Sequence, residues 1–240
     1  MWGIRENRIM HTHEESRLRL IMSAVLVAVF ASYISNSQAS ENITDHGQIS
    51  KVNSSIQLHS QEWADELHTI NGRIQLRAGS AAGKAETVNG SIQLEDGVRI
   101  GSAKTVNGAI RVGNNVHVHG SLETVNGSIR LESGAQVEGD VRNVNGAIAL
   151  DGGTVSGDLR TVNGRLSLRH GSTVHGDMII DESRQQGGFF RRLFLNYRSN
   201  TPGQIDIDAT SRVDGDIHLY RETRLNIHAD AVTGEIHHHY

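Results

Sequence analysis

The octapeptide Thr87-Val88-Asn89-Gly90-Ser91-Ile92-Gln93-Leu94 recurs along the chain with small variations. Its Asn-Gly pair occurs six times at a nearly constant spacing of 18 or 19 positions, and a degenerate copy precedes the first pair at the same spacing. The asparagines are Asn53 in the degenerate copy and then Asn71, Asn89, Asn107, Asn126, Asn145 and Asn163. A repeat of this length is typical of a supersecondary unit that stacks on copies of itself.

A shorter period of six residues runs inside each repeat. Aliphatic residues occupy every sixth position over a long stretch: Val52, Leu58, Ala64, Ile70, Leu76, Ala82, Val88, Leu94, Ile100, Val106, Val112 and Val118. Three such hexads make one repeat, and alternation within a hexad would point the aliphatic residues and the glycine inward from a short strand. The pattern therefore predicts an all-β fold, a three-sided parallel β-helix (β-solenoid) with coils of 18–19 residues.

The Asn-Gly pair has a second interpretation as a type I′ hairpin turn, which would make the chain an antiparallel meander or barrel. A hairpin array, however, has no reason to keep a six-residue period through turns and strands alike. In a solenoid the asparagines of successive coils lie about 4.8 Å apart, where their side-chain amides can bond one another in a column. We therefore interpret the seven asparagines as a structural ladder before any binding role.

Composition limits the classes of function. The repeat covers most of the 240 residues, which favours one elongated β-solenoid domain over residues 40–240. The formal charge is −4, and no basic patch is interleaved with aromatic residues, so we expect no nucleic-acid partner. The chain contains no cysteine, which excludes a disulfide framework and a lipoprotein anchor within it.

Residues 1–39 have the features of an export signal. Arg17 and Arg19 precede an apolar run over residues 20–34, and a small-x-small cleavage pattern follows at residues 37–39. The apolar run is shorter than the roughly 20 residues that a membrane span needs, but an uncleaved inner-membrane anchor stays open as an alternative. We expect an exported protein of the periplasm or outer cell envelope, or one anchored in the inner membrane and facing the periplasm.

The two ends of the repeat array differ from its middle. Residues 61–67 have the composition of a helical turn that could pack Trp63 over the first coil as a cap. At the other end, two degenerate coils lead to Tyr240, and no capping sequence follows them. An uncovered final coil is an edge that can pair with another chain, so self-association is expected.

An insert interrupts the array after Ile180. Asp177 and Asp216 hold equivalent places in a repeated phrase but lie more than two repeat lengths apart, which leaves one coil plus an insert at residues 181–200. We expect this segment to contact a membrane surface or an envelope protein, and the alternative is that it folds back on the flank of the solenoid. The candidate contact residues are Phe189, Phe190, Arg191, Arg192, Leu193, Phe194 and Tyr197, most of which would share one face of a short helix.

Two groups of residues invite a chemical interpretation. An acidic column is expected on successive coils, formed by Asp140, Asp158, Asp177, Asp216 and Glu235. It could bind a cation or a carbohydrate, or it could be a solvated face, since a like-charged pair at about 4.8 Å in water costs only about 0.9 kcal/mol. His117 and His119 could be half of a metal site, but the sequence near them offers no further ligand at a suitable spacing.

Two families of β-solenoids resemble this chain. The phrase Val-x-Gly-Asp-aliphatic, at residues 137–141, 155–159, 174–178 and 213–217, resembles the bactofilins, which are polymer-forming β-helical scaffold proteins. The Val-Asn-Gly-x-Ile copies resemble adhesin-like β-solenoids of bacterial envelopes. The resemblance implies a right-handed three-sided β-helix, often self-associating, with no cofactor and no catalytic residues.

These observations favour one function and leave a second open. The export segment and the insert are departures from bactofilins and favour the envelope family. We expect an exported, non-enzymatic structural or adhesion-like protein of the bacterial cell envelope. The alternative is a polysaccharide-binding or polysaccharide-cleaving β-helix that uses the acidic column. Nucleophile motifs such as Gly-x-Ser-x-Gly and phosphate-binding loops are absent from the sequence.

Overall fold

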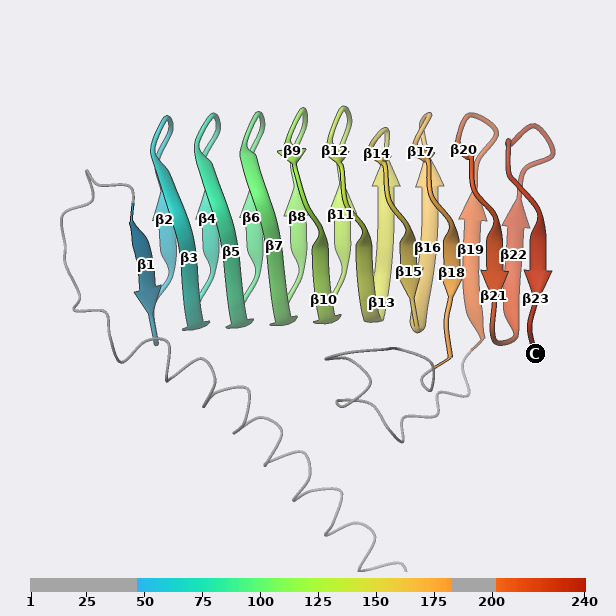
Figure 1. The fold of residues 1–240 in the computed structure, drawn as a ribbon, viewed down its shortest axis with the longest axis horizontal. Coiled ribbons are helices and arrows are strands. Elements are labelled where there is room, and N and C mark those ends of the chain that lie inside the picture. The colour runs from blue at the N-terminus through green and yellow to red at the C-terminus, as the bar shows by residue number, and fades with distance from the viewer. Residues whose placement is uncertain (1–46, 183–201) are drawn as a thin grey trace, which may run out of the picture. The chain divides into compact units, whose positions relative to one another are not determined.

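The computed structural model describes residues 47–182 and 202–240, and all of them belong to the compact unit Glu41–Tyr240. These residues form 23 β-strands, and every pairing between them is parallel. Paired residues are 18 or 19 positions apart along most of the stack, which confirms the predicted β-solenoid. In Figure 1 the strands nearest the viewer run downward while the chain advances from left to right, so the coil is right-handed.

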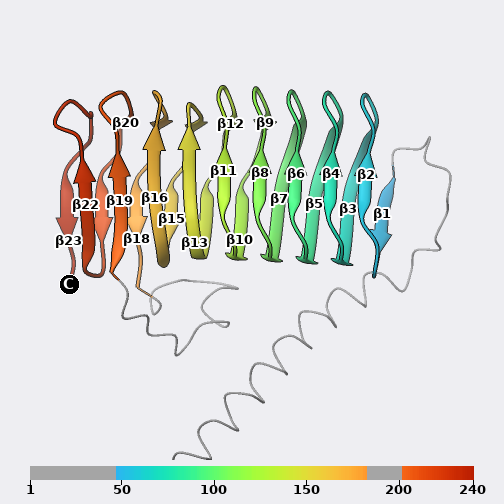
Figure 2. The same cartoon turned by 180° about the vertical axis from the view of Figure 1, so that it is seen from behind.

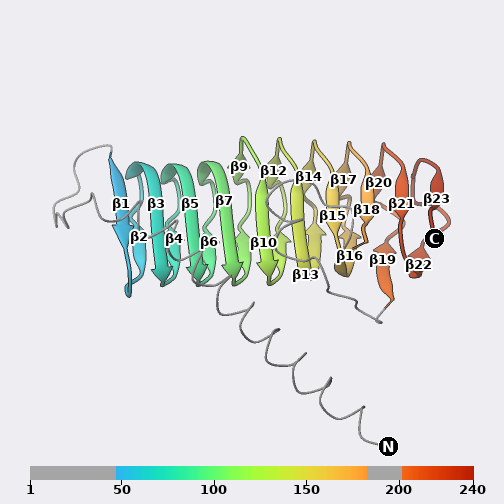
Figure 3. The ribbon, with the colours of Figure 1, turned by 60° about the horizontal axis from the view of Figure 1, so that its bottom comes forward.

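Three rows of strands run along the stack, and each row is one side of the solenoid. The first row contains β1 (Gln48–Lys51), β3 (Trp63–Asn71), β5 (Ala81–Asn89), β7 (Arg99–Asn107), β10 (Leu122–Asn126), β13 (Val141–Asp151), β15 (Leu159–Thr161), β18 (Met178–Ile180), β21 (Ile217–Leu219) and β23 (Ile236–His238). Figure 3 shows the first strands of this row side by side. The second row contains β2 (Ile56–Leu58), β4 (Ile74–Leu76), β6 (Ile92–Leu94), β8 (Ile110–Val112), β11 (Ile129–Leu131), β16 (Asn163–Arg169), β19 (Gly203–Ile207) and β22 (Thr223–Ile227).

The third row is the narrowest. It contains β9 (His117–Val118), β12 (Gln136–Val137), β14 (Thr154–Val155), β17 (Thr173–Val174) and β20 (Arg212–Val213). The early coils contribute to it through the first residues of β3, β5 and β7, and β13 continues from the first row into the second. The array therefore has three sides, as the three hexads of each repeat predicted.

The core consists of aliphatic columns inside the coil. One column begins with Ile56, Ile74 and Ile92 and continues through the second row, each residue paired with its counterpart one coil away. These side chains are fully buried, and each contributes about 1.5–3 kcal/mol of burial free energy. Because neighbouring coils share this burial, no coil can keep its core without the ones beside it.

The valines before the Asn-Gly pairs do not enter this core. Val125, Val144 and Val162 form a separate apolar cluster, with Val106 packed against it. The residue before each of them is a buried threonine or asparagine, such as Thr124 before Val125, and successive strand residues face opposite sides. The prediction that every aliphatic residue of the period points inward was therefore wrong for the first row.

The glycine of the Asn-Gly pair is required by close contact between coils rather than by a tight turn. A Cβ atom on Gly108 would lie 1.8 Å from the carbonyl oxygen of Gly90 in the preceding coil. Among the six Asn-Gly glycines, only Gly146 has a positive φ, so these pairs are not type I′ turns. The hairpin alternative is thus excluded, and the expected inward position of the glycine is corrected, because it faces the neighbouring backbone.

The predicted helical turn at residues 61–67 and the predicted insert after Ile180 have different outcomes in the structure. Residues 63–67 are part of strand β3, with Ala64 and Leu67 buried, so the predicted helical turn was wrong and Trp63 is exposed at the strand's start. The register jumps by 39 positions between Arg165 and Gln204, as the insert requires. Within the residues that the structure describes, no helix is long and apolar enough to cross a membrane.

Candidate functional site

The seven asparagines of the repeat lie in one file beside the first row of strands. In each coil the side-chain Nδ2 donates to the Oδ1 of the asparagine one coil earlier, over distances of 2.8–3.0 Å. The six bonds join Asn53, Asn71, Asn89, Asn107, Asn126, Asn145 and Asn163 without a break. All the amide dipoles point the same way, so the last amide oxygen of the file, at its C-terminal end, has no further asparagine to accept from.

Arg221 occupies that acceptor end. Its Nη1 donates to Oδ1 of Asn163 and, at 3.1 Å, to the backbone carbonyl of Val162. The next coils have Pro202 and Glu222 where the file would continue. A cation at the oxygen end of aligned dipoles is favourable, as it is at the C-terminus of a helix. The asparagine ladder is therefore a closed structural device with no amide left over for a ligand at this end.

A second ladder of buried hydroxyl groups lies under the first. Thr69, Thr87, Thr105 and Thr124 each donate Oγ1 to a backbone carbonyl at the corner of the preceding coil, at 2.9–3.0 Å. Asn143 takes the place of threonine in the following coil and donates to Gly127 at 3.3 Å. Our sequence reasoning missed this role. The signal was the threonine that stands two positions before most Asn-Gly pairs.

The acidic column also holds coils together. In four successive steps, the Oδ1 of one residue accepts the backbone N–H of its counterpart one coil later, at 2.8–3.0 Å. The acceptors are Asp140, Asp158, Asp177 and Asp216, and the last donor is the N–H of Glu235. A carboxylate that accepts a backbone N–H forms a charge-assisted hydrogen bond. Each aspartate thus has one oxygen committed to the stack and one facing outward.

Cations on the same face balance the outward oxygens. Arg142 Nη2 lies 2.5 Å from Oδ2 of Asp140, and Arg160 bridges Asp158 and the buried Asp181 at 3.7 and 3.5 Å. Hydrogen bonds from the N–H of Glu235 and from the His237 ring hold the pKa of Asp216 below its usual value. These pairs favour the structural interpretation of the column over a cation site, since the positions that a cation would fill already hold side-chain nitrogens.

Of the two histidines that could have formed half of a metal site, His119 contacts a possible further ligand, the carboxylate of Glu138. His119 Nδ1 lies 3.1 Å from Oε1 of Glu138, and His117 pairs in register with Arg99 and Gln136. Near the C-terminus the ring of His218 stacks on those of His237 and His239, and the ring of His239 also stacks on Tyr220. Across residues 47–182 and 202–240 there is no group of three or more histidine, aspartate and glutamate side chains arranged to hold a metal ion.

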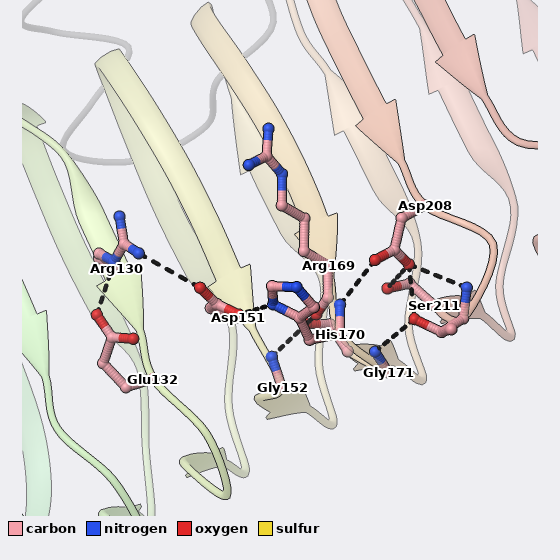
Figure 4. Close-up of polar contacts among 11 residues, drawn as sticks. Arg130, Glu132, Asp151, Gly152, Arg169, His170, Gly171, Asp208 and Ser211 are labelled. Atoms are coloured by element: carbon pink, nitrogen blue, oxygen red, sulfur yellow. Dashed lines mark hydrogen bonds and ion pairs between the residues drawn. The ribbon is translucent and has the colours of Figure 1, made fainter.

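A polar corner between the second and third rows contains the residue types of a catalytic site, namely serine, histidine and aspartate (Figure 4). The backbone N–H of His170 donates to Asp208 at 2.7 Å, and Ser211 Oγ donates to the same carboxylate at 2.7 Å. The imidazole Nδ1 bonds Asp151, and this hydrogen bond raises the pKa of His170. Partial burial works against the charge of Asp208, but its hydrogen bonds prevail and lower the pKa to about 2.

This corner lacks the geometry of a nucleophilic triad. A serine nucleophile needs its hydroxyl hydrogen-bonded to the imidazole that removes its proton, whereas Ser211 donates to the Asp208 carboxylate. Gly171 donates its N–H to Thr210 Oγ1 at 2.9 Å, so the corner ties one coil to the next, as the ladders do. Sequence reasoning missed this cluster because its members come from separate coils and share no motif.

The contact residues proposed in the insert, Phe189, Phe190, Arg191, Arg192, Leu193, Phe194 and Tyr197, lie outside the residues that the structure describes. The described chain reaches Glu182 and resumes at Pro202. Searches of family models, curated proteins and solved structures find no match to this chain.

Proposed function

We propose that this chain is an exported, non-enzymatic structural or adhesion-like β-solenoid of the bacterial cell envelope. The observation that carries the proposal is that the most regular columns of polar side chains form hydrogen bonds between neighbouring coils. The asparagine file, the threonine hydroxyls and one oxygen of each of Asp140, Asp158, Asp177 and Asp216 all bond the neighbouring coil. Side chains committed in this way stiffen a shaft, and they are poorly available for proton transfer or ligand exchange.

The resemblance of the Val-x-Gly-Asp phrases to bactofilins supports a scaffolding role, and the apolar segment at residues 20–34 supports export. In this role the useful property is a rigid surface of fixed length. Specific contacts would then come from places where the repeat is broken, which are the insert and the last coil.

Isosteric substitution tests this proposal against its alternative. Asp158→Asn and Asp177→Asn, made together, keep the Oδ1 acceptor for the next coil but remove the charge and the proton-transfer capacity. In a deletion strain whose envelope is scored by detergent resistance, the double variant should restore resistance to within about two-fold of wild type. Gly108→Val, which breaks the stack, should restore nothing and serves as the negative control.

The alternative function, polysaccharide binding or cleavage, has one observation in its favour. The side chains of Asp177 and Asp216 are 41% and 43% exposed on neighbouring coils, and each outward oxygen lies beside a histidine ring rather than an arginine. If the double aspartate variant folds with wild-type stability but fails to restore detergent resistance, the carboxylates have a chemical role. The structural proposal would then be abandoned in favour of this alternative.

The insert is the second part of the proposal. We propose that residues 181–200 contact a membrane surface or an envelope protein through their aromatic and basic side chains. Replacing residues 183–201 by a short Gly-Ser linker should abolish co-sedimentation with anionic liposomes. Unchanged sedimentation of the linker variant would remove the membrane arm of the proposal.

A further inference from the structure

The two ends of the described stack differ in how well their cores are covered. In the first coil, Ile56 and Leu58 are 1% and 0% exposed. In the last coil, the core residues Leu225 and Ile236 are 37% and 38% exposed, and the adjacent Val232 is 52% exposed. Figure 2 shows β22 and β23 at the C-terminal end of the array. The C-terminal coil is therefore the end with an open apolar surface.

Both terminal coils have unpaired strand edges, but only at the C-terminal coil do exposed core positions lie beside them. Among the described strands, β22 pairs only with β19 and β23 only with β21, as β1 pairs only with β3 and β2 only with β4 at the other end. Each of them therefore has one edge whose N–H and C=O groups point away from the stack. Apolar side chains beside such an edge are a template for pairing with another chain.

The direction of winding decides how a second copy can fit. A copy that stacks head to tail would present its first coil, whose core is already covered. A copy turned end over end presents its own open last coil, and the turn reverses the sense in which its chain circulates. The facing strands then run antiparallel, so the two open surfaces can meet only through antiparallel edge pairs.

Strand β22 is compatible with such a pair. When it is placed antiparallel to itself about Leu225, Thr223 lies opposite Ile227 and Arg224 lies opposite Asn226. One step further out, Glu222 lies opposite His228. No like charges face each other in this register, and two leucines meet at its centre.

We propose that two copies of this chain associate through their C-terminal coils into a closed dimer with a two-fold axis at Leu225. The contact is isologous, so it uses up the open end of both copies and does not propagate into a filament. The inference rests on the self-association that the sequence leads us to expect at the last coil, and it specifies the partner, the strand register and the size of the assembly.

Because the chain has no cysteine, engineered cysteines report the contact directly. Leu225→Cys places two thiols on the two-fold axis, and mild oxidation should give a covalent dimer in most of the protein. Val52→Cys is the matched control, since Val52 is an exposed apolar residue of the first coil and should stay uncrosslinked. Crosslinking between Leu225→Cys and Val52→Cys in a mixture would instead establish head-to-tail stacking and overturn the closed dimer.

Analytical ultracentrifugation of the purified chain separates failure of this inference from failure of self-association. The expected species has twice the chain mass, and Leu225→Asp should weaken it at least ten-fold, a loss of about 1.4 kcal/mol, whereas Val52→Asp should not. Circular dichroism must show both variants folded. Species that grow beyond the dimer would overturn the closed dimer but keep self-association, whereas a strict monomer at high concentration would overturn both.

Discussion

The shaft and the C-terminal coils hold their strands together by different means. From Asn53 to Asn163, a hydrogen bond between asparagine side chains joins each coil to its neighbour at one corner. From Asp140 to Glu235, a hydrogen bond from a backbone N–H to an aspartate carboxylate does so at another corner. The two systems overlap for only a few coils. Of these two ladders, only the carboxylate ladder continues past the insert.

The difference shows what an insertion costs a solenoid. Pro202 stands where the next asparagine would lie, and proline has neither a side-chain amide nor a backbone N–H to donate. The strand register recovers at once, since Arg165 pairs with Gln204, but the amide file does not. Burial in the core is therefore sufficient to restore the stack, and the amide ladder adds stability where the chain is uninterrupted.

The largest expected effect breaks the shaft at its closest contact. Gly108→Ala puts a methyl group 1.8 Å from the Gly90 carbonyl, so the coils must move apart and the unfolding free energy should fall by about 3 kcal/mol or more. Gly97→Ala is the control, because its added Cβ meets nothing within 4 Å and costs only the strain of a positive φ, about 1–2 kcal/mol. Urea denaturation of both variants measures the difference, and equal losses would contradict the close-contact argument.

The amide ladder provides the next effect. Asn107→Ala removes two ladder bonds, to Asn89 and from Asn126, and should lower the unfolding free energy by about 1–2 kcal/mol. Asn53→Ala removes only the bond from Asn71 and should cost about half as much. Urea midpoints compare the two variants. If the terminal substitution proved as costly as the central one, the ladder would not be a sum of neighbouring bonds.

Much of this architecture was predictable because the sequence period of a solenoid equals the number of residues in one coil. The interval between Asp177 and Asp216 predicted the register across the insert, and the Asn-Gly spacing predicted the amide file. Both inferences needed only the rule that equivalent residues stack. Neither required knowledge of how the backbone bends within a coil.

The features that the sequence did not reveal depend on that bend. Threonine and valine occupy adjacent positions before most of the asparagines, and the period alone cannot say which of the two faces the core. The structure places Thr105 inside because its hydroxyl can satisfy a corner carbonyl, and Val106 joins the separate cluster. The Asp208 corner stayed hidden for another reason, since its partners come from coils with different residues at equivalent places.

The pH dependence of stability sharpens the comparison at the N-terminal part of the shaft. Burial opposes the charge of Glu86, but hydrogen bonds from His68 and Lys84 prevail and lower its pKa to about 2. Burial likewise opposes the charge of His68, but Glu86 and Glu66 raise its pKa. Glu86 therefore stabilises the fold above its ordinary value near 4.5, and this contribution is lost as the pH falls toward 2. His68 stabilises it below 6.5, and this contribution is lost as the pH rises through its raised pKa.

The urea midpoint should therefore be highest between about pH 4.5 and 6.5, with a decline on each side. Glu86→Gln should remove most of the acid decline and weaken the alkaline one, because it removes the carboxylate and leaves Glu66 as the remaining partner that raises the pKa of His68. Glu132→Gln is a suitable control, since Glu132 pairs with Arg130 at the solvent-exposed corner. A profile in which both declines are unchanged in Glu86→Gln would assign the pH dependence to other groups.

The smallest expected effect concerns Arg221 at the C-terminal end of the asparagine ladder. Arg221 donates to the last oxygen of the asparagine file, so Arg221→Ala should destabilise the fold by about 1 kcal/mol when the whole ladder is present. Most of that loss should disappear in an Asn163→Ala background, because the group that the guanidinium serves is already gone. Denaturation of the four proteins in this cycle gives the coupling free energy directly.

Arg224→Ala, at an exposed position of β22, is the control and should change stability by less than about 0.5 kcal/mol in either background. A coupling near zero would mean that Arg221 acts on the coil through contacts other than the ladder, and that the amide file ends without a cap.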